Sequence, residues 1–149
     1  MPVIEKANPE DQAAVQAIVM AAYAHYIDRN GLTPGPMKDD YAALIAAGRV
    51  NVLRDETGVA GVLVLIPEED CLLLDNVAVS PTAQGKGYGR ILLDYAESIA
   101  RAMSFARIRL YTQVIMTENQ AIYAKRGYIE THRAVEKGLH RVFMEKVLA

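Results

Sequence analysis

The chain has 149 residues, of which 52% are hydrophobic and 23% are charged, a length that suits a single domain over residues 1–149. It has 16 Lys and Arg residues against 18 Asp and Glu, and it contains no block of basic residues. This near-neutral charge argues against a nucleic-acid-binding protein. No apolar run approaches the roughly 20 residues that cross a bilayer, the start lacks a secretory signal, and the single cysteine, Cys71, fits a reducing compartment. We therefore expect a cytoplasmic protein that does not bind membranes.

The first third of the chain predicts a short strand followed by two helices. Asn8-Pro9 supplies a cap and a first-turn proline for a helix whose apolar residues recur at helical spacing up to Tyr26. Thr33-Pro34-Gly35-Pro36 interrupts the pattern. Residues 37–47 then predict a second, shorter helix that ends at Gly48.

The remaining two thirds predict six strands and two helices. Strands are expected at residues 50–54, 59–66 and 72–79, and their nearly continuous apolar character indicates a sheet that is covered on both faces. After them the pattern predicts a long helix marked by Leu92 to Met103, a strand at 108–112, a helix at 117–125, and strands at 128–136 and 141–148. This order predicts a mixed α/β or α+β fold with helices on both faces of the sheet.

The most informative segment joins the third of these strands to the long helix, and it reads Gln84-Gly85-Lys86-Gly87-Tyr88-Gly89-Arg90. Backbone N–H groups at a helix start lack intrahelical acceptors and lie at the positive end of the helix dipole. Glycines allow an anion to approach those groups closely, and Lys86 and Arg90 add positive charge. The segment therefore predicts a phosphate or pyrophosphate site.

The glycines also admit three other interpretations. They can simply make a tight turn and let the helix pack closely on the sheet. A Walker A loop requires Ser or Thr after its lysine, whereas Lys86 precedes Gly87 and Ser80 occupies the position of the first glycine. The dinucleotide fingerprint Gly-x-Gly-x-x-Gly also fails, because the spacing here is Gly-x-Gly-x-Gly.

The segment resembles the GCN5-related N-acetyltransferases, the GNAT superfamily. The phosphate-binding signature of that family, Gln/Arg-x-x-Gly-x-Gly/Ala, is matched from Gln84 to Gly89, and Asp75 to Pro81 matches its fourth strand. Residues 119–128 resemble its Asn…Tyr-x-x-x-Gly-Phe element, with Tyr128 replacing phenylalanine. The resemblance covers essentially the whole chain and implies a mixed, mostly antiparallel sheet that splays between its fourth and fifth strands.

The resemblance also implies acetyl-CoA as the acetyl donor, bound where those two strands separate. By position, the backbones of Val77 and Val79 would pair with the pantetheine arm, and a backbone N–H near Ala78 would stabilise the oxyanion. The amides from Gly85 to Arg90 would hold the pyrophosphate, and Asn119 would hydrogen-bond CoA or cap its helix. The implied cofactor-binding residues are Val77, Ala78, Val79, Gln84, Gly85, Lys86, Gly87, Tyr88, Gly89, Arg90 and Asn119.

Direct attack of an amine on the thioester needs a base for the amine and a proton for the departing thiolate. Tyr123 occupies the position of the family's general acid, and an ordinary tyrosine pKa of about 10 keeps it protonated; the competing interpretation is a core tyrosine. Asp75, a charge in an apolar strand, is the candidate base, and the alternative is an aspartate that only hydrogen-bonds backbone. Tyr111 stands where some members carry a carboxylate, so no second acidic candidate appears there.

The sequence leaves the acceptor open. The family builds its acceptor pocket from the first two helices, where aromatic and acidic residues here suit a small cationic amine. A peptide amine, or a helix pair whose charges are simply solvated, fits these residues too.

The three histidines lack metal-ligand spacing, so no metal is expected. We thus predict an N-acetyltransferase, with a non-catalytic CoA-binding sensor or subunit as the alternative. A homodimer through the terminal strands is common in the family. The residues that the first two helices offer are Tyr23, His25, Tyr26, Asp28, Arg29, Asn30, Met37, Asp39, Asp40 and Tyr41.

Overall fold

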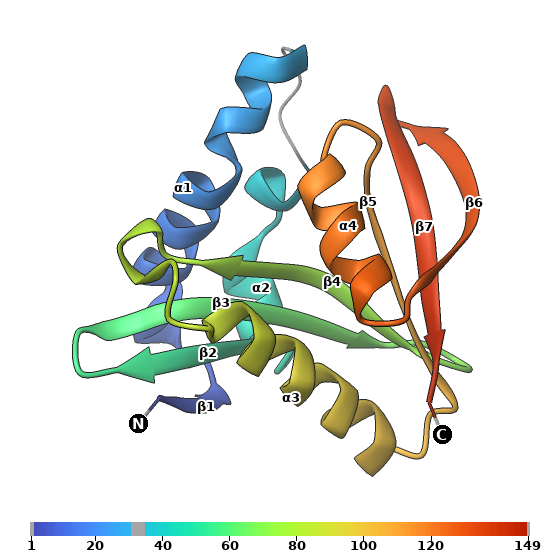
Figure 1. Ribbon diagram of the computed structural model, residues 1–149. Coiled ribbons are helices and arrows are strands. Elements are labelled where there is room, and N and C mark those ends of the chain that lie inside the picture. Colours follow the sequence, from blue (N-terminus) through green and yellow to red (C-terminus); the bar gives the residue numbers. More distant parts are fainter. Residues whose placement is uncertain (1, 31–34, 149) are drawn as a thin grey trace. The chain divides into compact units, whose positions relative to one another are not determined.

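The computed structural model describes residues 2–30 and 35–148. Its strands are hydrogen-bonded in the order β1-β2-β3-β4-β5-β7-β6 (Figure 1), mostly antiparallel with one parallel pair, as the resemblance implied. Close contacts divide the chain into two compact units, Met1–Leu65 with Asn76–Ala96, and Ile66–Asp75 with Glu97–Ala149. No helix within the described ranges has the length and apolar character needed to cross a membrane.

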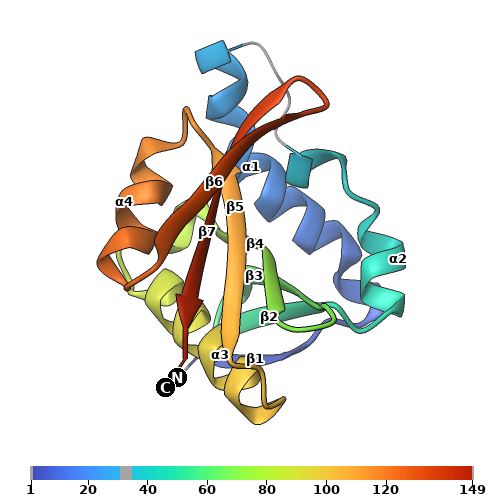
Figure 2. The same cartoon turned by 90° about the vertical axis from the view of Figure 1, so that its right-hand side faces the viewer.

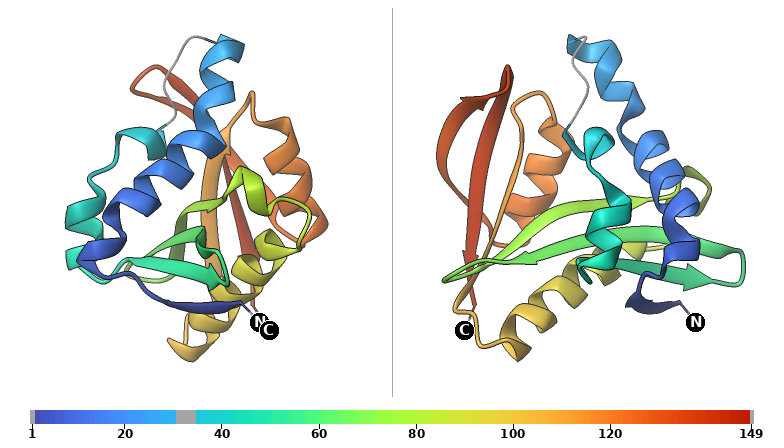
Figure 3. Two further views of the ribbon diagram at one scale, coloured as in Figure 1. Left: turned by 90° about the vertical axis from the view of Figure 1, so that its left-hand side faces the viewer. Right: turned by 180° about the vertical axis from the view of Figure 1, so that it is seen from behind.

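The first unit packs helices on both faces of its strands. In Figure 3, α1 and α2 cover one face of β2 and β3, and the first half of α3 lies on the other. This arrangement confirms the covered sheet that the apolar strands predicted, and residues 60–65 of β3 are all buried. The elements are β1 (Val3–Lys6), the 3-10 turn η1 (Pro9–Asp11), α1 (Gln12–Asn30), the 3-10 turn η2 (Gly35–Lys38), α2 (Tyr41–Ala46), β2 (Val50–Asp55), β3 (Gly58–Pro67) and α3 (Tyr88–Ala102).

Gly61 of β3 lets α3 approach the sheet closely. A Cβ atom at this position would lie 3.0 Å from Leu92 Cδ1 and 3.3 Å from Leu53 Cβ. Both leucines are fully buried, so neither can move aside without opening a gap in the core. A Cβ atom here would press on both buried neighbours, so packing favours glycine at this position.

The second predicted helix is shorter than expected. It begins at Tyr41 rather than at residue 37, and residues 35–38 form the separate turn η2. The reason is Asp40, whose extended backbone (φ −84°, ψ 91°) cannot continue a helix and whose side chain accepts a hydrogen bond from the Ala43 amide (3.1 Å). Residues 33 and 34 of the predicted break lie outside the described part of the chain.

The second unit is a β5-β7-β6 sheet with α4 against one side of β5 (Figure 2). Side chains alternate along β5 and β7: Ile108, Leu110, Val142 and Met144 are buried, while those between them are partly exposed. β6 pairs only along one edge, and it carries a bulge between Glu130 and His132. The elements are β5 (Arg107–Gln113), α4 (Thr117–Lys125), β6 (Ile129–Glu136) and β7 (Leu139–Val147).

β4 (Leu72–Val79) pairs with β5 over a short stretch only. The parallel ladder joins Leu72 to Ile108, then Leu73 to Arg109, and ends with Leu74 and Leu110. Beyond that point β4 continues for five residues and β5 for three without pairing to each other. The parallel ladder thus ends partway along both strands, at the level where the resemblance implies that the fourth and fifth strands separate.

Candidate functional site

The predicted phosphate loop leads from β4 into α3 in the first unit (Figure 1). A 3-10 turn, η3 (Pro81–Ala83), follows β4, and α3 begins at Tyr88. Gly85 (φ +84°) and Gly87 (φ +80°) adopt the left-handed backbone conformation, which glycine takes without steric cost. Most other residues could therefore adopt the backbone conformation of this loop only with steric strain.

The loop glycines are surrounded by open space. A Cβ atom built at Gly85, Gly87 or Gly89 would meet no atom of the described chain within 4 Å, in contrast to Gly61. Gly89 also has no positive φ, so neither backbone conformation nor packing requires a glycine there. Close packing of the helix on the sheet therefore does not explain these three glycines, although the positive φ of Gly85 and Gly87 fits a tight turn. The open space leaves room for a ligand beside the backbone amides.

Two side chains at the loop, Lys86 and Tyr88, contact Asp55 at the end of β2. Tyr88 Oη donates to Asp55 Oδ2 (2.7 Å), and Lys86 Nζ lies 3.9 Å from the same oxygen. Hydrogen bonds from Thr57 and Tyr88 lower the pKa of Asp55 to about 2, and the Asp55 carboxylate raises the pKa of Tyr88 to about 12. Arg90 is exposed. Asp55 thus fixes the first residue of α3 and offsets part of the Lys86 charge.

The last residues of β4 present backbone groups along the edge away from β3. The Ser80 amide donates to Ala60 O of β3 (2.8 Å), so the backbone groups of Ser80 and, two residues earlier, Ala78 face β3. Those of Val77 and Val79 then face the opposite edge. Gln84 Nε2 lies 3.4 Å from the outward carbonyl oxygen of Val79. The outward amides at the predicted acetyl position thus belong to Val77 and Val79.

Asp75, the candidate base, belongs to the second unit and contacts β5. Tyr111 Oη donates to Asp75 Oδ1 (3.1 Å), and the guanidinium of Arg141 lies 4.4 Å from the centre of the Tyr111 ring. Burial raises the pKa of Asp75, while the Tyr111 hydrogen bond and the Arg141 charge act to lower it. A carboxylate with a raised pKa is suited to accept a proton near neutral pH.

Tyr123, the candidate acid, lies near the end of α4 in the second unit and is buried. Its ring packs edge-on against Tyr128, with the ring centres 5.8 Å apart. Gln120 Nε2 holds the helix to the preceding loop by donating to Gln113 O (3.1 Å) and Val114 O (2.9 Å). Asn119 does not cap α4, because the N-cap residue is Met116; its Nδ2 lies 3.8 Å from Met116 Sδ.

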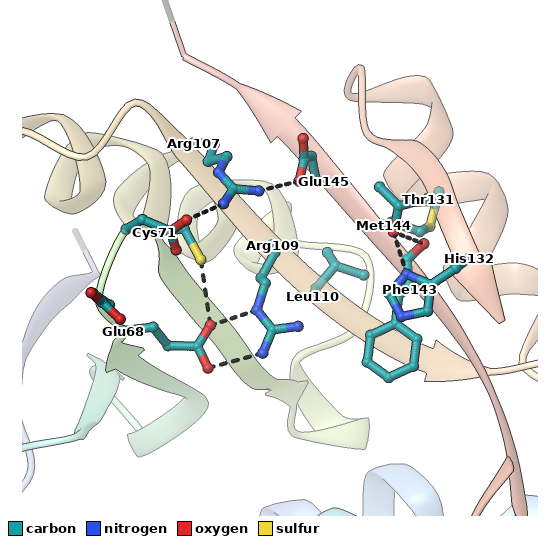
Figure 4. Close-up of a pocket in the computed structure, with 12 residues that line it drawn as sticks. Glu68, Cys71, Arg107, Arg109, Leu110, Thr131, His132, Phe143, Met144 and Glu145 are labelled. Carbon is teal, nitrogen blue, oxygen red and sulfur yellow. Dashed lines mark hydrogen bonds and ion pairs between the residues drawn. The ribbon is translucent and has the colours of Figure 1, made fainter. Parts of the chain in front are cut away.

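The second unit also contains a polar pocket of about 490 Å³ that the sequence did not predict. In Figure 4, Arg109 faces Glu68 and donates to its carboxylate from Nε and Nη2, and the His132 ring stacks on Phe143. Its charged groups pair mostly with one another, and none of the predicted site residues lines it. The residues that line it are Glu68, Glu69, Asp70, Cys71, Arg107, Arg109, Leu110, Thr131, His132, Phe143, Met144 and Glu145.

The predicted site residues thus fall into two groups. The phosphate loop and the outward edge of β4 lie together in the first unit, and Asp75, Asn119 and Tyr123 lie in the second. Sequence reasoning missed Tyr111 as the partner of Asp75, because the sequence shows only that a tyrosine stands where some family members carry a carboxylate. Of the predicted acceptor residues, the side chains at 25–30 lie outside the described part of the structure.

A family model matches most of the chain, and solved structures share its fold. The model of the family described as "Acetyltransferase (GNAT) family" matches residues 15–128. The fold is similar to that of the PaiA N-acetyltransferase of Thermoplasma acidophilum in complex with coenzyme A (TM-score 0.80, 17% identity, 99% of each chain covered). It is also similar to the ribosomal-protein-S18-alanine N-acetyltransferase of Escherichia coli (TM-score 0.77, 18% identity, covering 100% of this chain and 95% of that one). A search of curated proteins found no match.

Proposed function

Because the chain belongs to the acetyltransferase (GNAT) family, we propose that it transfers the acetyl group of acetyl-CoA to a primary amine by direct attack in a ternary complex. The observation that carries the proposal is the glycine loop, whose open space at Gly85, Gly87 and Gly89 suits a diphosphate against backbone amides. Acetyl-CoA, when bound, supplies an activated thioester. The alternative, a CoA-binding sensor without catalysis, has the same loop.

The donor is held mainly by backbone groups. The amides from Gly85 to Arg90 bind the diphosphate at the start of α3, with Lys86 and Arg90 adding charge. The outward groups of Val77 and Val79 hydrogen-bond the pantetheine arm as an added strand would. An outward N–H beside Ala78, from one of these two valines, stabilises the developing oxyanion.

Two side chains move protons. Asp75, with its raised pKa, accepts a proton from the attacking amine directly or through a water. Tyr123 donates a proton to the departing thiolate. Tyr111 keeps the Asp75 carboxyl oriented through its hydrogen bond. Asn119 adds a hydrogen bond to the donor.

The acceptor is an amine of a small molecule or of a peptide. The Escherichia coli neighbour is named for an alanine of a ribosomal protein, and the Thermoplasma acidophilum neighbour was solved with coenzyme A. We further propose that the protein acts in the cytoplasm and forms a homodimer through its terminal strands. Light scattering after gel filtration tests the dimer.

A charge swap at Gly87 tests the donor site. Asn and Asp are alike in size and tolerate a positive φ, so Gly87→Asn is the control for Gly87→Asp. We expect Gly87→Asp to weaken CoA binding at least about tenfold more than Gly87→Asn, because it places a negative charge beside the diphosphate. Isothermal titration calorimetry measures both. Equal affinities for the two variants would overturn the assignment of the loop.

Release of CoA thiol in the presence of an amine panel tests the catalysis. The panel comprises polyamines, amino acids, aminoglycosides and peptides with free N-termini. Cys71 gives little background with a thiol reagent, because it is buried and burial raises its pKa to about 11. CoA binding without turnover on any amine would favour the sensor instead.

A further inference from the structure

A buried side-chain amide sits directly before the outward edge of β4. Asn76 is 2% exposed, and both ends of its amide are hydrogen-bonded within the first unit. Tyr23 Oη, from α1, donates to Asn76 Oδ1 (2.8 Å), and Asn76 Nδ2 donates to Tyr41 Oη of α2 (3.0 Å). One residue of β4 thereby joins the two helices that cover this face of the sheet.

The same network reaches the backbone of the next residue. Tyr23 Oη also donates to the carbonyl oxygen of Val77 (3.1 Å), so its single proton is shared between that oxygen and Asn76 Oδ1. This carbonyl faces the edge of β4 away from β3, as argued above from the Ser80–Ala60 hydrogen bond. At the other end of the network, Tyr41 Oη donates to Pro36 O (2.5 Å).

Such a network is demanding to maintain among the buried apolar residues of β4. Residues 72–74 and Ala78 are buried hydrophobic residues, and an apolar side chain at Asn76 would avoid the need for two buried partners. Fully satisfied, however, a buried polar network fixes a single arrangement of the groups it joins. The group that it fixes here, besides the two helices, is the Val77 carbonyl.

We propose that Tyr23 and Asn76 are positioning residues that hold the Val77 carbonyl in the orientation in which it accepts an amide N–H of the pantetheine arm. The inference rests on the proposed function. A carbonyl oxygen has two lone pairs, so the Tyr23 hydroxyl and a ligand N–H can share it. If the ligand takes the better geometry, Tyr23 keeps its shorter hydrogen bond to Asn76 Oδ1 and no buried hydroxyl loses its partner.

Two ligands separate this role from a general structural one. CoA contains the pantetheine arm, whereas 3′-phospho-ADP is the same molecule without it. For Tyr23→Phe we expect the Kd of CoA to rise about fivefold, the loss of one hydrogen bond, and the Kd of 3′-phospho-ADP to stay within about twofold. Tyr41→Phe removes the remote partner of Asn76 and the hydrogen bond to Pro36 O, neither of which touches Val77, so its effect on CoA should be smaller but equally selective. Tyr128→Phe, in the second unit, is the control for loss of a buried tyrosine hydroxyl.

Calorimetric titration of both ligands into the wild type and the variants distinguishes the possible outcomes. An equal loss for the two ligands, or no loss for CoA, overturns the positioning role while leaving the proposed function intact. Failure of the wild-type protein to bind either ligand overturns the proposed function itself. If Tyr23→Phe does not fold, as judged by its thermal unfolding, the selectivity of Tyr41→Phe decides.

Discussion

The hydroxyl of Tyr111 donates a 3.1 Å hydrogen bond to Oδ1 of Asp75, joining the centre of β5 to β4 just past the end of their ladder. Burial raises the pKa of Asp75, and this hydrogen bond opposes the effect because it favours the charged carboxylate. The Tyr111 hydroxyl therefore favours the charged form of Asp75.

Tyr111→Phe should move the acidic limb of the pH–rate profile to higher pH. A base works when deprotonated, so the rate falls as the pH drops through the pKa of Asp75, and removing the hydrogen bond raises that pKa further. Profiles of kcat/KM against pH for wild type, Tyr111→Phe and the control Tyr128→Phe measure the shift. An unchanged or lower midpoint in Tyr111→Phe would exclude Asp75 as the base that limits the rate.

Tyr123→Phe should lower kcat about 100-fold while the Kd of CoA stays within about twofold, because a general acid acts on the leaving group and not on binding. The edge-on contact with Tyr128 survives the change, since the ring is kept. Stopped-flow rates of CoA release and calorimetric binding together provide the comparison. A loss confined to binding would assign Tyr123 to the donor site or to the core.

Gly89→Ala should have opposite effects on stability and on binding. Gly89 lies in α3 with no positive φ, and alanine in a helix is about 0.5–1 kcal/mol more favourable than glycine. The added methyl meets no protein atom, yet it enters the space assigned to the diphosphate. We expect a higher melting temperature together with weaker CoA binding. A variant that gains stability and binds CoA as the wild type does would place the diphosphate elsewhere.

Local sequence patterns predicted much of the fold. The bounds of β4 and α4 were predicted without error, because Pro81 and Gly127 mark their ends and periodicity fills the rest. The start of α2 was missed because Asp40 was assigned to the helix interior rather than to its cap. The loop glycines were correctly separated from other nucleotide motifs by spacing alone, since each motif fixes a different backbone path.

The partners of the site residues could not be predicted. Asp75 and Tyr111 are 36 residues apart, and Tyr23 and Asn76 are 53 apart, so no local pattern links them. The pocket around Glu68 and Arg109 is lined by a loop and three strands, which lie side by side because of the strand order of the sheet. Contacts of this kind follow from register and topology, which a single sequence specifies only weakly.

Tyr128→Phe should leave the free energy of unfolding unchanged or raise it by about 1 kcal/mol. Tyr128 is 2% exposed, and its hydroxyl has no hydrogen-bond partner among the described residues. Burial raises its pKa, as expected for a phenol shut away from water. A buried hydroxyl without a partner costs stability, and the ring packing against Tyr123 is kept in the variant. Urea unfolding followed by circular dichroism measures the difference. A loss above about 1 kcal/mol would mean that the hydroxyl is satisfied in solution, by a buried water for example.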